Sequence, residues 1–297
     1  MSDNKPPTVR DALVAGTRHL REAGIESAAL DMSLLIAEAV GCDRIGVYLN
    51  QDRPMDQAER KRLRALFDRR VRREPIAYIL GRREFHGLSF EVGPAVLIPR
   101  PETEHLVEAA VEWMREGKLK YELRTGNSTP LVADIGTGSG AIAVAIAHAV
   151  ENCRVIATDV SVEALVVAKR NAERHAIADR IEFRQGALFE PIREELDAIV
   201  SNPPYVAETD RATLAPDVIA YEPHTALFSG PDGLDCIREL VAQAPHHLRA
   251  GGRLWIEIGA GQSLAVQNLL EQTGAFESIS FIKDYAGIDR VAQAARR

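Results

Sequence analysis

From residue 131 onward, short apolar segments alternate with segments of helical periodicity, and this alternation constrains the fold more than any other feature. A strand that is apolar on both faces must be covered on both, and helices between successive strands provide that cover and make the strands parallel. The expected strands lie at 131–135, 153–158, 181–185, 197–201, 253–258, 277–283 and 288–293. Only 284–287 separate the last two, so these should pair antiparallel. The sequence predicts an α/β fold with a seven-stranded, mostly parallel, Rossmann-like sheet.

The segment before this alternation has a different organisation. Residues 1–75 show apolar residues at helical spacing and predict a small helical bundle that ends at Glu74 and Pro75. Residues 76–95 have strand-like composition, and Gly87 is placed as the turn of a β-hairpin. We therefore expect three parts: a helical domain at 1–75, a hairpin linker at 76–95 and the α/β domain at 96–297.

Length, charge and cysteine content narrow the class of protein. The 297 residues suffice for two domains, and the longest apolar stretch, 141–147, is far shorter than the ~18 to 20 residues of a spanning helix. Residues 1–10 lack the apolar core of a secretory signal, so a cytoplasmic location is expected. The three cysteines show no pairing or metal pattern, the histidines show no ligand spacing, and no metal is predicted.

The net charge of −7 argues against a general nucleic-acid binder but hides a basic run. Residues 53–73 contain nine basic side chains against three acidic ones. Such a run is either the solvated face of a helix or a surface that docks an acidic or RNA-containing partner. The sequence leaves both interpretations open.

A glycine-rich turn follows the first strand of the α/β domain. Its residues are Gly136, Thr137, Gly138, Ser139 and Gly140, and Asp159 lies 23 residues after Gly136, at the end of the second strand. Alternate glycines let the backbone approach a ligand closely, and the acid suits the two hydroxyls of a ribose. Dinucleotide-binding proteins share this pattern. Asp134 favours S-adenosylmethionine instead, because we expect its carboxylate to face the region a pyrophosphate would occupy.

A second motif follows the fourth strand and consists of Asn202, Pro203, Pro204 and Tyr205. Each proline lacks an N–H and restricts the backbone, so the Pro203 carbonyl stays free to accept a hydrogen bond. The side-chain oxygen of Asn202 is a second acceptor. Two acceptors in one plane match the two N–H bonds of a conjugated NH₂ group, and Tyr205 could offer its ring face to a developing positive charge. A proline-rich turn without function is the alternative.

Together with these motifs, further segments make the chain resemble the glutamine methyltransferases that modify class I peptide-chain release factors. The segments are 73–81 (REPIAYILG), 85–90 (FHGLSF), 96–104 (VLIPRPETE), 134–140 (DIGTGSG), 202–205 (NPPY) and 221–234 (YEPHTALFSGPDGL). The resemblance covers nearly the full chain. It implies a class I methyltransferase sheet with a helical, substrate-docking amino-terminal domain, S-adenosyl-L-methionine as cofactor, and transfer of its methyl group to the side-chain nitrogen (N5) of a glutamine.

The resemblance also assigns residues. Asn202, Pro203 and Tyr205 would be catalytic, and Asn202 through Tyr205 would hold the glutamine. The cofactor would contact Asp134, residues 136–140, Asp159 and Asn202. The stretch 186–189 departs from the family pattern, so adenine would rest on Leu188 and backbone groups. Arg100, Glu102 and the loop at 222–233 would shape the cavity wall.

Two other functions stay open at this point. One is methylation of an adenine amino group in DNA or RNA, since that nitrogen is equally planar and conjugated; it would require a flipped or unpaired base. The other is a non-catalytic nucleotide-binding or RNA-docking module that uses the basic run at 53–73. The acidic balance argues against the nucleic-acid substrate. We expect class I release factors as partners, as the resemblance implies, with no membrane and no stable nucleic-acid partner, and a monomeric chain.

Overall fold

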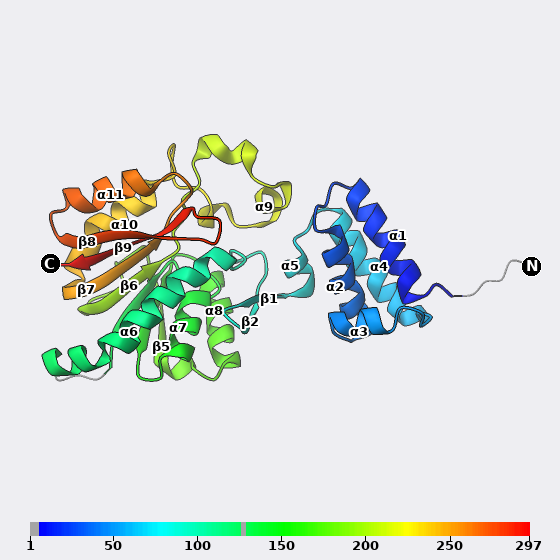
Figure 1. Ribbon diagram of the computed structural model, residues 1–297, viewed down its shortest axis with the longest axis horizontal. Helices are drawn as coiled ribbons and strands as arrows, with labels where there is room; N and C mark the ends of the chain where they lie inside the picture. The colour runs from blue at the N-terminus through cyan, green and yellow to red at the C-terminus, as the bar shows by residue number, and fades with distance from the viewer. Residues whose placement is uncertain (1–5, 126–128) are drawn as a thin grey trace, which may run out of the picture. The chain divides into compact units, whose positions relative to one another are not determined.

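The computed structural model describes residues 6–125 and 129–297, and it divides into two compact units (Figure 1). The first unit contains the chain up to Gly81 together with Ala215–Tyr221, and the second contains Arg82–Leu214 and Glu222–Arg297. The inclusion of Ala215–Tyr221 in the first unit was not anticipated from the sequence. Among the described helices, none is long and apolar enough to cross a bilayer.

The first unit is a helical bundle. Its helices are α1 (Val9–Glu22), α2 (Ala28–Val40), α3 (Arg44–Leu49), α4 (Gln57–Val71), α5 (Ile76–Leu80) and α9 (Pro216–Tyr221). The side chains of Thr8 and Asp11 cap the amino terminus of α1 reciprocally. Leu20, Leu35 and Ile36 are fully buried in the centre of the bundle, where α1, α2 and α4 meet.

The second unit is built on a seven-stranded sheet, which confirms the predicted fold class. The strands and the hairpin before them are β1 (Arg82–Phe85), β2 (Leu88–Glu91), β3 (Leu131–Ile135), β4 (Arg154–Asp159), β5 (Ile181–Gln185), β6 (Leu196–Ser201), β7 (Leu248–Glu257), β8 (Phe276–Lys283) and β9 (Asp289–Arg296). The sheet order is β5-β4-β3-β6-β7-β9-β8, with only the β7–β9 and β9–β8 pairings antiparallel. β1 and β2 form the separate hairpin expected around Gly87.

Helices cover both faces of this sheet (Figure 1). They are α6 (Glu104–Thr125), α7 (Ala141–Ala149), α8 (Val162–Arg174), α10 (Asp235–Gln243) and α11 (Ser263–Gln272), with 3₁₀ turns at Pro101–Thr103, Ala178–Arg180, Glu208–Thr213, His224–Ala226 and Ala244–His246. One core packs α6 and α7 against alternate strand residues, and a second packs α10 and α11 against the others.

Strand order and register together place the site. The chain runs from β3 outward to β5 and then crosses to β6 on the other side of β3, so the carboxyl ends of β3 and β6 form a topological switch point. One row of paired residues crosses four strands: Thr158, Ile135, Ser201 and Ile256. The residues that follow them are Asp159, Gly136, Asn202 and Glu257. Both sequence motifs therefore emerge side by side at one edge of the sheet.

Candidate functional site

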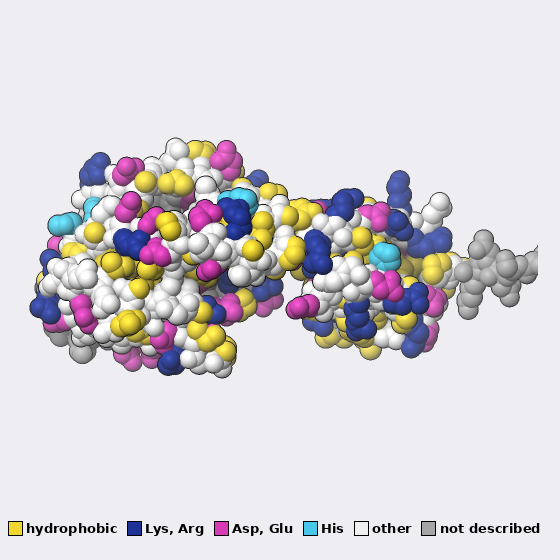
Figure 2. Space-filling view, turned by 90° about the horizontal axis from the view of Figure 1, so that it is seen from above, with side chains coloured by type: hydrophobic (Ala, Val, Ile, Leu, Met, Phe, Trp, Pro, Cys, Tyr) yellow, Lys and Arg dark blue, Asp and Glu magenta, His cyan; other side chains and the backbone are white. Residues whose placement is uncertain are grey.

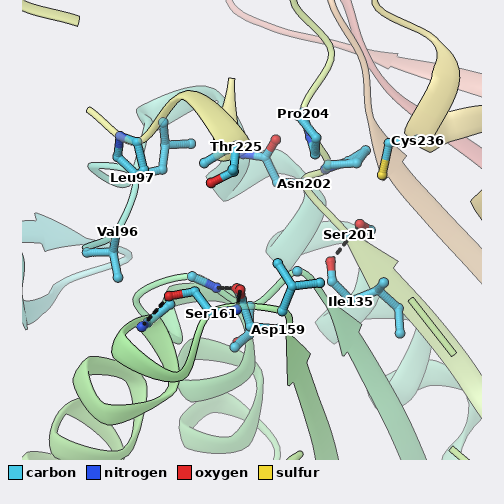
Figure 3. Close-up of a pocket in the computed structure, with 18 of the residues that line it drawn as sticks. Val96, Leu97, Ile135, Asp159, Ser161, Ser201, Asn202, Pro204, Thr225 and Cys236 are labelled. Atoms are coloured by element: carbon cyan, nitrogen blue, oxygen red, sulfur yellow. Dashed lines mark hydrogen bonds between the residues drawn. The ribbon is translucent and has the colours of Figure 1, made fainter. Parts of the chain in front are cut away.

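A cavity of about 720 Å³ opens at this edge of the sheet, within the second unit. Figure 3 shows Asp159 and Ser161 on one wall, with Asn202, Pro204 and Thr225 across from them. The Ser201 hydroxyl donates to the Ile135 carbonyl over 2.7 Å and ties β6 to β3 at the switch point. The cavity thus joins the glycine turn and the Asn-Pro-Pro-Tyr motif, as their positions after neighbouring strands require.

The glycine turn forms the floor of the cavity. Gly136 and Gly138 line it with φ of 73° and 56°, a left-handed conformation that other residues rarely adopt. A Cβ built at either position meets no protein atom within 4 Å, so the space beside them is left to a ligand. Gly140 differs. It does not line the cavity, and a Cβ there would lie 3.0 Å from the Ala168 Cβ. The lack of a Cβ at Gly140 therefore lets α7 pack closely on α8.

Two aspartates support this turn from different sides. Asp159 lines the cavity, and its carboxylate accepts hydrogen bonds of 2.9 Å from the backbone N–H groups of Gly138 and Ser161. Asp134 lies behind the turn, fully buried and outside the lining, and its Oδ2 accepts from the Thr137 hydroxyl and the Ala143 N–H. Its Oδ1 has no partner among the described residues. Burial raises the pKa of this carboxyl to about 7.

Leu188 lines the cavity on the side of β4 and β5. Its φ of 47° is unusual for a residue with a branched side chain, and the Thr158 hydroxyl holds its carbonyl at 3.2 Å. Backbone strain of this kind persists where the surroundings enforce it, often at ligand sites. The hydrogen bond from Thr158 therefore helps to hold the Leu188 backbone in this conformation beside the cavity.

The Asn-Pro-Pro-Tyr motif forms the opposite wall. Asn202, Pro203 and Pro204 line the cavity, and the Asn202 Nδ2 donates to the Thr103 hydroxyl over 3.1 Å. Within the described part of the chain, neither the Asn202 Oδ1 nor the Pro203 carbonyl accepts a hydrogen bond from the protein. Both acceptors that the sequence singled out are therefore available to a ligand.

Tyr205 lies differently from its two proline neighbours. It does not line the cavity, and its hydroxyl donates to Glu257 Oε1 over 3.2 Å. The Thr103 hydroxyl donates to the other oxygen, Glu257 Oε2, over 2.5 Å. Burial, with the negative charge and hydrogen bond of Glu257, raises the pKa of the Tyr205 phenol. The contribution of the Tyr205 ring face to the chemistry stays a prediction.

An ion pair fastens the outer wall. Arg100 reaches Glu222 over 2.6 Å, and the other oxygen of Glu222 accepts from the Ile98 N–H over 3.1 Å. Glu222 is 1% exposed in its side chain. This pair joins the loop that carries Leu97 and Pro99 to the loop that carries Pro223, and these three residues line the cavity.

The charge of the lining selects among ligands. Four carboxylates face the cavity, and among the described residues its lining includes no Lys, Arg or His; the carboxylates are Asp159, Glu163, Asp235 and Glu239. Such a cavity attracts a cation and repels a pyrophosphate or a nucleic-acid backbone. In the basic run at 53–73, Arg53, Arg64, Arg69 and Arg70 form ion pairs within the bundle. Figure 2 shows basic and acidic side chains interspersed over this unit on the face in view.

The structure thus brings most of the predicted site residues to one cavity and leaves Asp134, Gly140 and Tyr205 outside its lining. It adds Thr103, which lines the cavity, and Glu257, which lies behind it. Glu257 ends a strand beside β6, and an acid at the carboxyl end of a parallel strand was a signal the sequence already offered. Thr103 carried no such signal, because only the fold brings it to Asn202.

Both parts of the chain are similar to known proteins. Two family models match: the PrmC N-terminal domain over residues 11–81 and the methyltransferase small domain over 121–232. A release factor glutamine methyltransferase of Geobacter sulfurreducens is 42% identical over 96% of this chain and 95% of its own length. One of Rhodopirellula baltica is 40% identical over 98% and 97%. The catalytic domain of hMettl16, solved in complex with a MAT2A 3′UTR hairpin, has the same fold, with a TM-score of 0.55 at 18% identity over 78% of this chain and 80% of that one.

Proposed function

The chain belongs to the release factor glutamine methyltransferase family and is a methyltransferase, and we propose that it methylates the side-chain nitrogen (N5) of the glutamine in the Gly-Gly-Gln motif of class I release factors. The methyl donor is S-adenosyl-L-methionine. The observation that carries the proposal is the pair of free acceptors, Asn202 Oδ1 and the Pro203 carbonyl, that face a carboxylate-lined cavity beside a glycine turn.

The residues present fit this cofactor. Its sulfonium and ammonium groups are cationic, and the lining is acidic without basic residues among those described. Asp159 is placed to accept from the ribose hydroxyls, and Gly136 and Gly138 leave room for close approach. Leu188 offers an apolar surface for the adenine.

Bound there, the cofactor supplies a methyl carbon made electrophilic by the adjacent sulfonium. A glutamine nitrogen is a weak nucleophile, because its lone pair is delocalised into the carbonyl. Asn202 Oδ1 and the Pro203 carbonyl would accept from its two N–H bonds and hold it toward the methyl group. The glutamine nitrogen would take the methyl group, leaving the electron pair of the S–C bond on sulfur, and would then lose one proton to water. Positioning and acceptors for the developing positive charge provide the catalysis.

Methylation of an adenine amino group is the competing function, because Asn202 and Pro203 could hold that nitrogen similarly. Two features favour a protein substrate: the lining contains no cationic side chain among its described residues, and Arg53, Arg69 and Arg70 of the 53–73 run pair with acidic side chains of their own unit. We extend the proposal to a monomeric, cytoplasmic enzyme without a stable nucleic-acid partner. In it, the helical unit docks the release factor.

The test offers release factor, DNA and RNA in parallel to the purified protein with labelled S-adenosylmethionine. We expect label only on the release factor, and mass spectrometry should place one methyl group on the glutamine of its Gly-Gly-Gln motif. Asn202→Ala should abolish transfer while calorimetry shows that the cofactor still binds. Label on nucleic acid alone, or near-normal turnover by Asn202→Ala, would refute the proposal.

A further inference from the structure

A buried carboxylate lies directly behind the substrate-facing wall and has no part in the chemistry described so far. Glu257 is the last residue of β7 and 1% exposed, and it follows Ile256, which pairs with Ser201 immediately before Asn202. Burying a carboxylate without a cationic partner in contact is costly. A position this close to the reacting groups therefore calls for a function.

Hydrogen bonds connect Glu257 to Asn202 in two steps. The Thr103 hydroxyl donates to Glu257 Oε2 over 2.5 Å, and the Asn202 Nδ2 donates to that same hydroxyl oxygen over 3.1 Å. Thr103 is 4% exposed and belongs to the 3₁₀ turn Pro101–Thr103 before α6. The other Glu257 oxygen accepts from the Tyr205 hydroxyl.

The direction of these bonds follows from counting hydrogens. A threonine hydroxyl has one hydrogen, and the ionised Glu257 can only accept, so this hydrogen is committed to Glu257. Thr103 can then offer Asn202 only a lone pair, and it must receive the NH₂ end of the amide. The carbonyl end of Asn202 is thereby turned toward the cavity. If the amide were rotated by 180°, two N–H groups would face the NH₂ of the substrate and only the Pro203 carbonyl would be left to accept from it.

We propose that Glu257 is a positioning residue that acts through Thr103 to hold the Asn202 amide with Oδ1 facing the methyl-accepting nitrogen. This inference rests on the proposed function for the identity of that nitrogen. Glu257 touches neither substrate nor cofactor in this scheme. Its charge fixes the orientation of a side chain whose two ends differ by only one atom and have opposite hydrogen-bonding character.

The charge state of Glu257 makes this device sensitive to pH. Burial raises the pKa of Glu257 to about 7, and the negative charge of Glu102 adds to the rise, while the hydroxyls of Thr103 and Tyr205 and the positive charge of Arg290 oppose it. Protonated Glu257 carries its own hydrogen and releases that of Thr103, so either end of the Asn202 amide becomes acceptable. Methyl transfer should therefore rise with pH, with the midpoint of the rise near pH 7.

Glu257→Gln tests this directly, because glutamine keeps the shape but can accept from only one of the two hydroxyls through its oxygen. We expect kcat for release factor methylation to fall on the order of tenfold to a hundredfold. We further expect loss of the rise in kcat between pH 6 and 8, and an unchanged dissociation constant for S-adenosylmethionine. Thr103→Val should reproduce the loss, and Thr103→Ser should restore most of the activity.

Asp197→Asn is the matched control, because Asp197 is equally buried at the other end of neighbouring β6, where it pairs with Arg249. It should lower stability and leave the pH profile of kcat unchanged.

A wild-type pH profile in Glu257→Gln, or full activity in Thr103→Val, would overturn the inference while the proposed function stands. If the wild type methylates no release factor, the proposed function fails. In that case the side-chain ¹⁵N resonance of Asn202 still tests the role of Glu257. Its chemical shift should change with pH around 7 in the wild type and stay constant in Glu257→Gln.

Discussion

At the scale of single residues, Asp159 has two roles, one in holding the glycine turn and one in facing the cavity. Its carboxylate holds the N–H groups of Gly138 and Ser161, and it also faces the cavity. Asp159→Asn keeps one acceptor oxygen but loses the charge and one acceptor for the ribose. We expect the dissociation constant for S-adenosylmethionine, measured by calorimetry, to rise about tenfold, the equivalent of one hydrogen bond to a charged group. Glu182→Gln, on the exposed part of β5, should bind normally, and equal affinity in both variants would remove Asp159 from the cofactor site.

Asp134 gives a prediction about stability and pH. Burial raises its pKa from 3.8 to about 7, so the folded state holds this proton more tightly than the unfolded state. Between pH 4 and 7, rising pH therefore favours the unfolded state, and the loss of stability levels off above pH 7. Asp134→Asn removes this titration. We expect the free energy of unfolding of the variant, relative to wild type, to improve by about 4 kcal/mol from pH 4 to 8 in urea titrations. A constant difference would show that the pKa is not raised.

At the scale of elements, the fully buried side chain of Asn171 on α8 joins the hairpin to the glycine turn. Its Oδ1 accepts from the Glu91 N–H over 2.7 Å, and its Nδ2 donates to the carbonyls of Glu91 and Ser139 over 3.0 and 2.8 Å. Asn171→Ala leaves these three backbone groups without their partner. We expect a loss of about 3 kcal/mol in the free energy of unfolding and weaker cofactor binding, because Ser139 is part of the turn.

His175→Ala is the control for this element, because the His175 ring contacts the Ser89 carbonyl of the same strand at the surface. It should cost less than about 1 kcal/mol, since water can replace an exposed partner. Both values follow from denaturant titrations monitored by circular dichroism. Equal losses in the two variants would mean that the buried amide contributes no more than a surface contact.

At the scale of elements, the sequence predicted the features that depend on local residues and did not predict the contacts between distant ones. The sheet, its antiparallel last pair and the hairpin at Gly87 depend on local periodicity and turn residues, and all are confirmed. The free Pro203 carbonyl follows from the restricted backbone of proline, and the Asn202 acceptor follows from its side-chain amide. The link from Asn202 through Thr103 to Glu257 joins residues 99 and 154 positions apart and exists only in the folded chain. The position of Asp134 behind the turn was likewise missed, because its strand gives two faces and the sequence does not say which one meets the ligand.

At the scale of the whole molecule, one segment belongs to a different unit from its sequence neighbours. Residues 215–221 lie between the Asn-Pro-Pro-Tyr motif and the Glu222 loop in sequence, and they pack with the helical unit. The Tyr221 hydroxyl donates to the Arg72 carbonyl over 2.8 Å, and Asp217 lies 3.7 Å from the Arg70 guanidinium. Arg70 also pairs with the buried Asp31 at 2.7 Å. Arg70 therefore connects α2, α4 and α9 within one unit.

Removal of Arg70 should show how far the whole enzyme depends on this unit. Arg70→Leu leaves the carboxylate of Asp31, 1% exposed, without its partner, and we expect the helical unit to lose roughly 3 to 5 kcal/mol of stability. Arg64→Leu, whose partner Asp68 is exposed, should cost less than about 1 kcal/mol. The double variant Arg70→Leu with Asp31→Leu should recover much of the loss, because no buried charge is then left unpaired.

If the helical unit docks the release factor, Arg70→Leu should raise KM for that substrate and leave cofactor affinity unchanged, since every cavity residue lies in the other unit. Kinetics at several release factor concentrations and calorimetry with S-adenosylmethionine measure both quantities, and an unchanged KM in a destabilised variant would contradict the docking role.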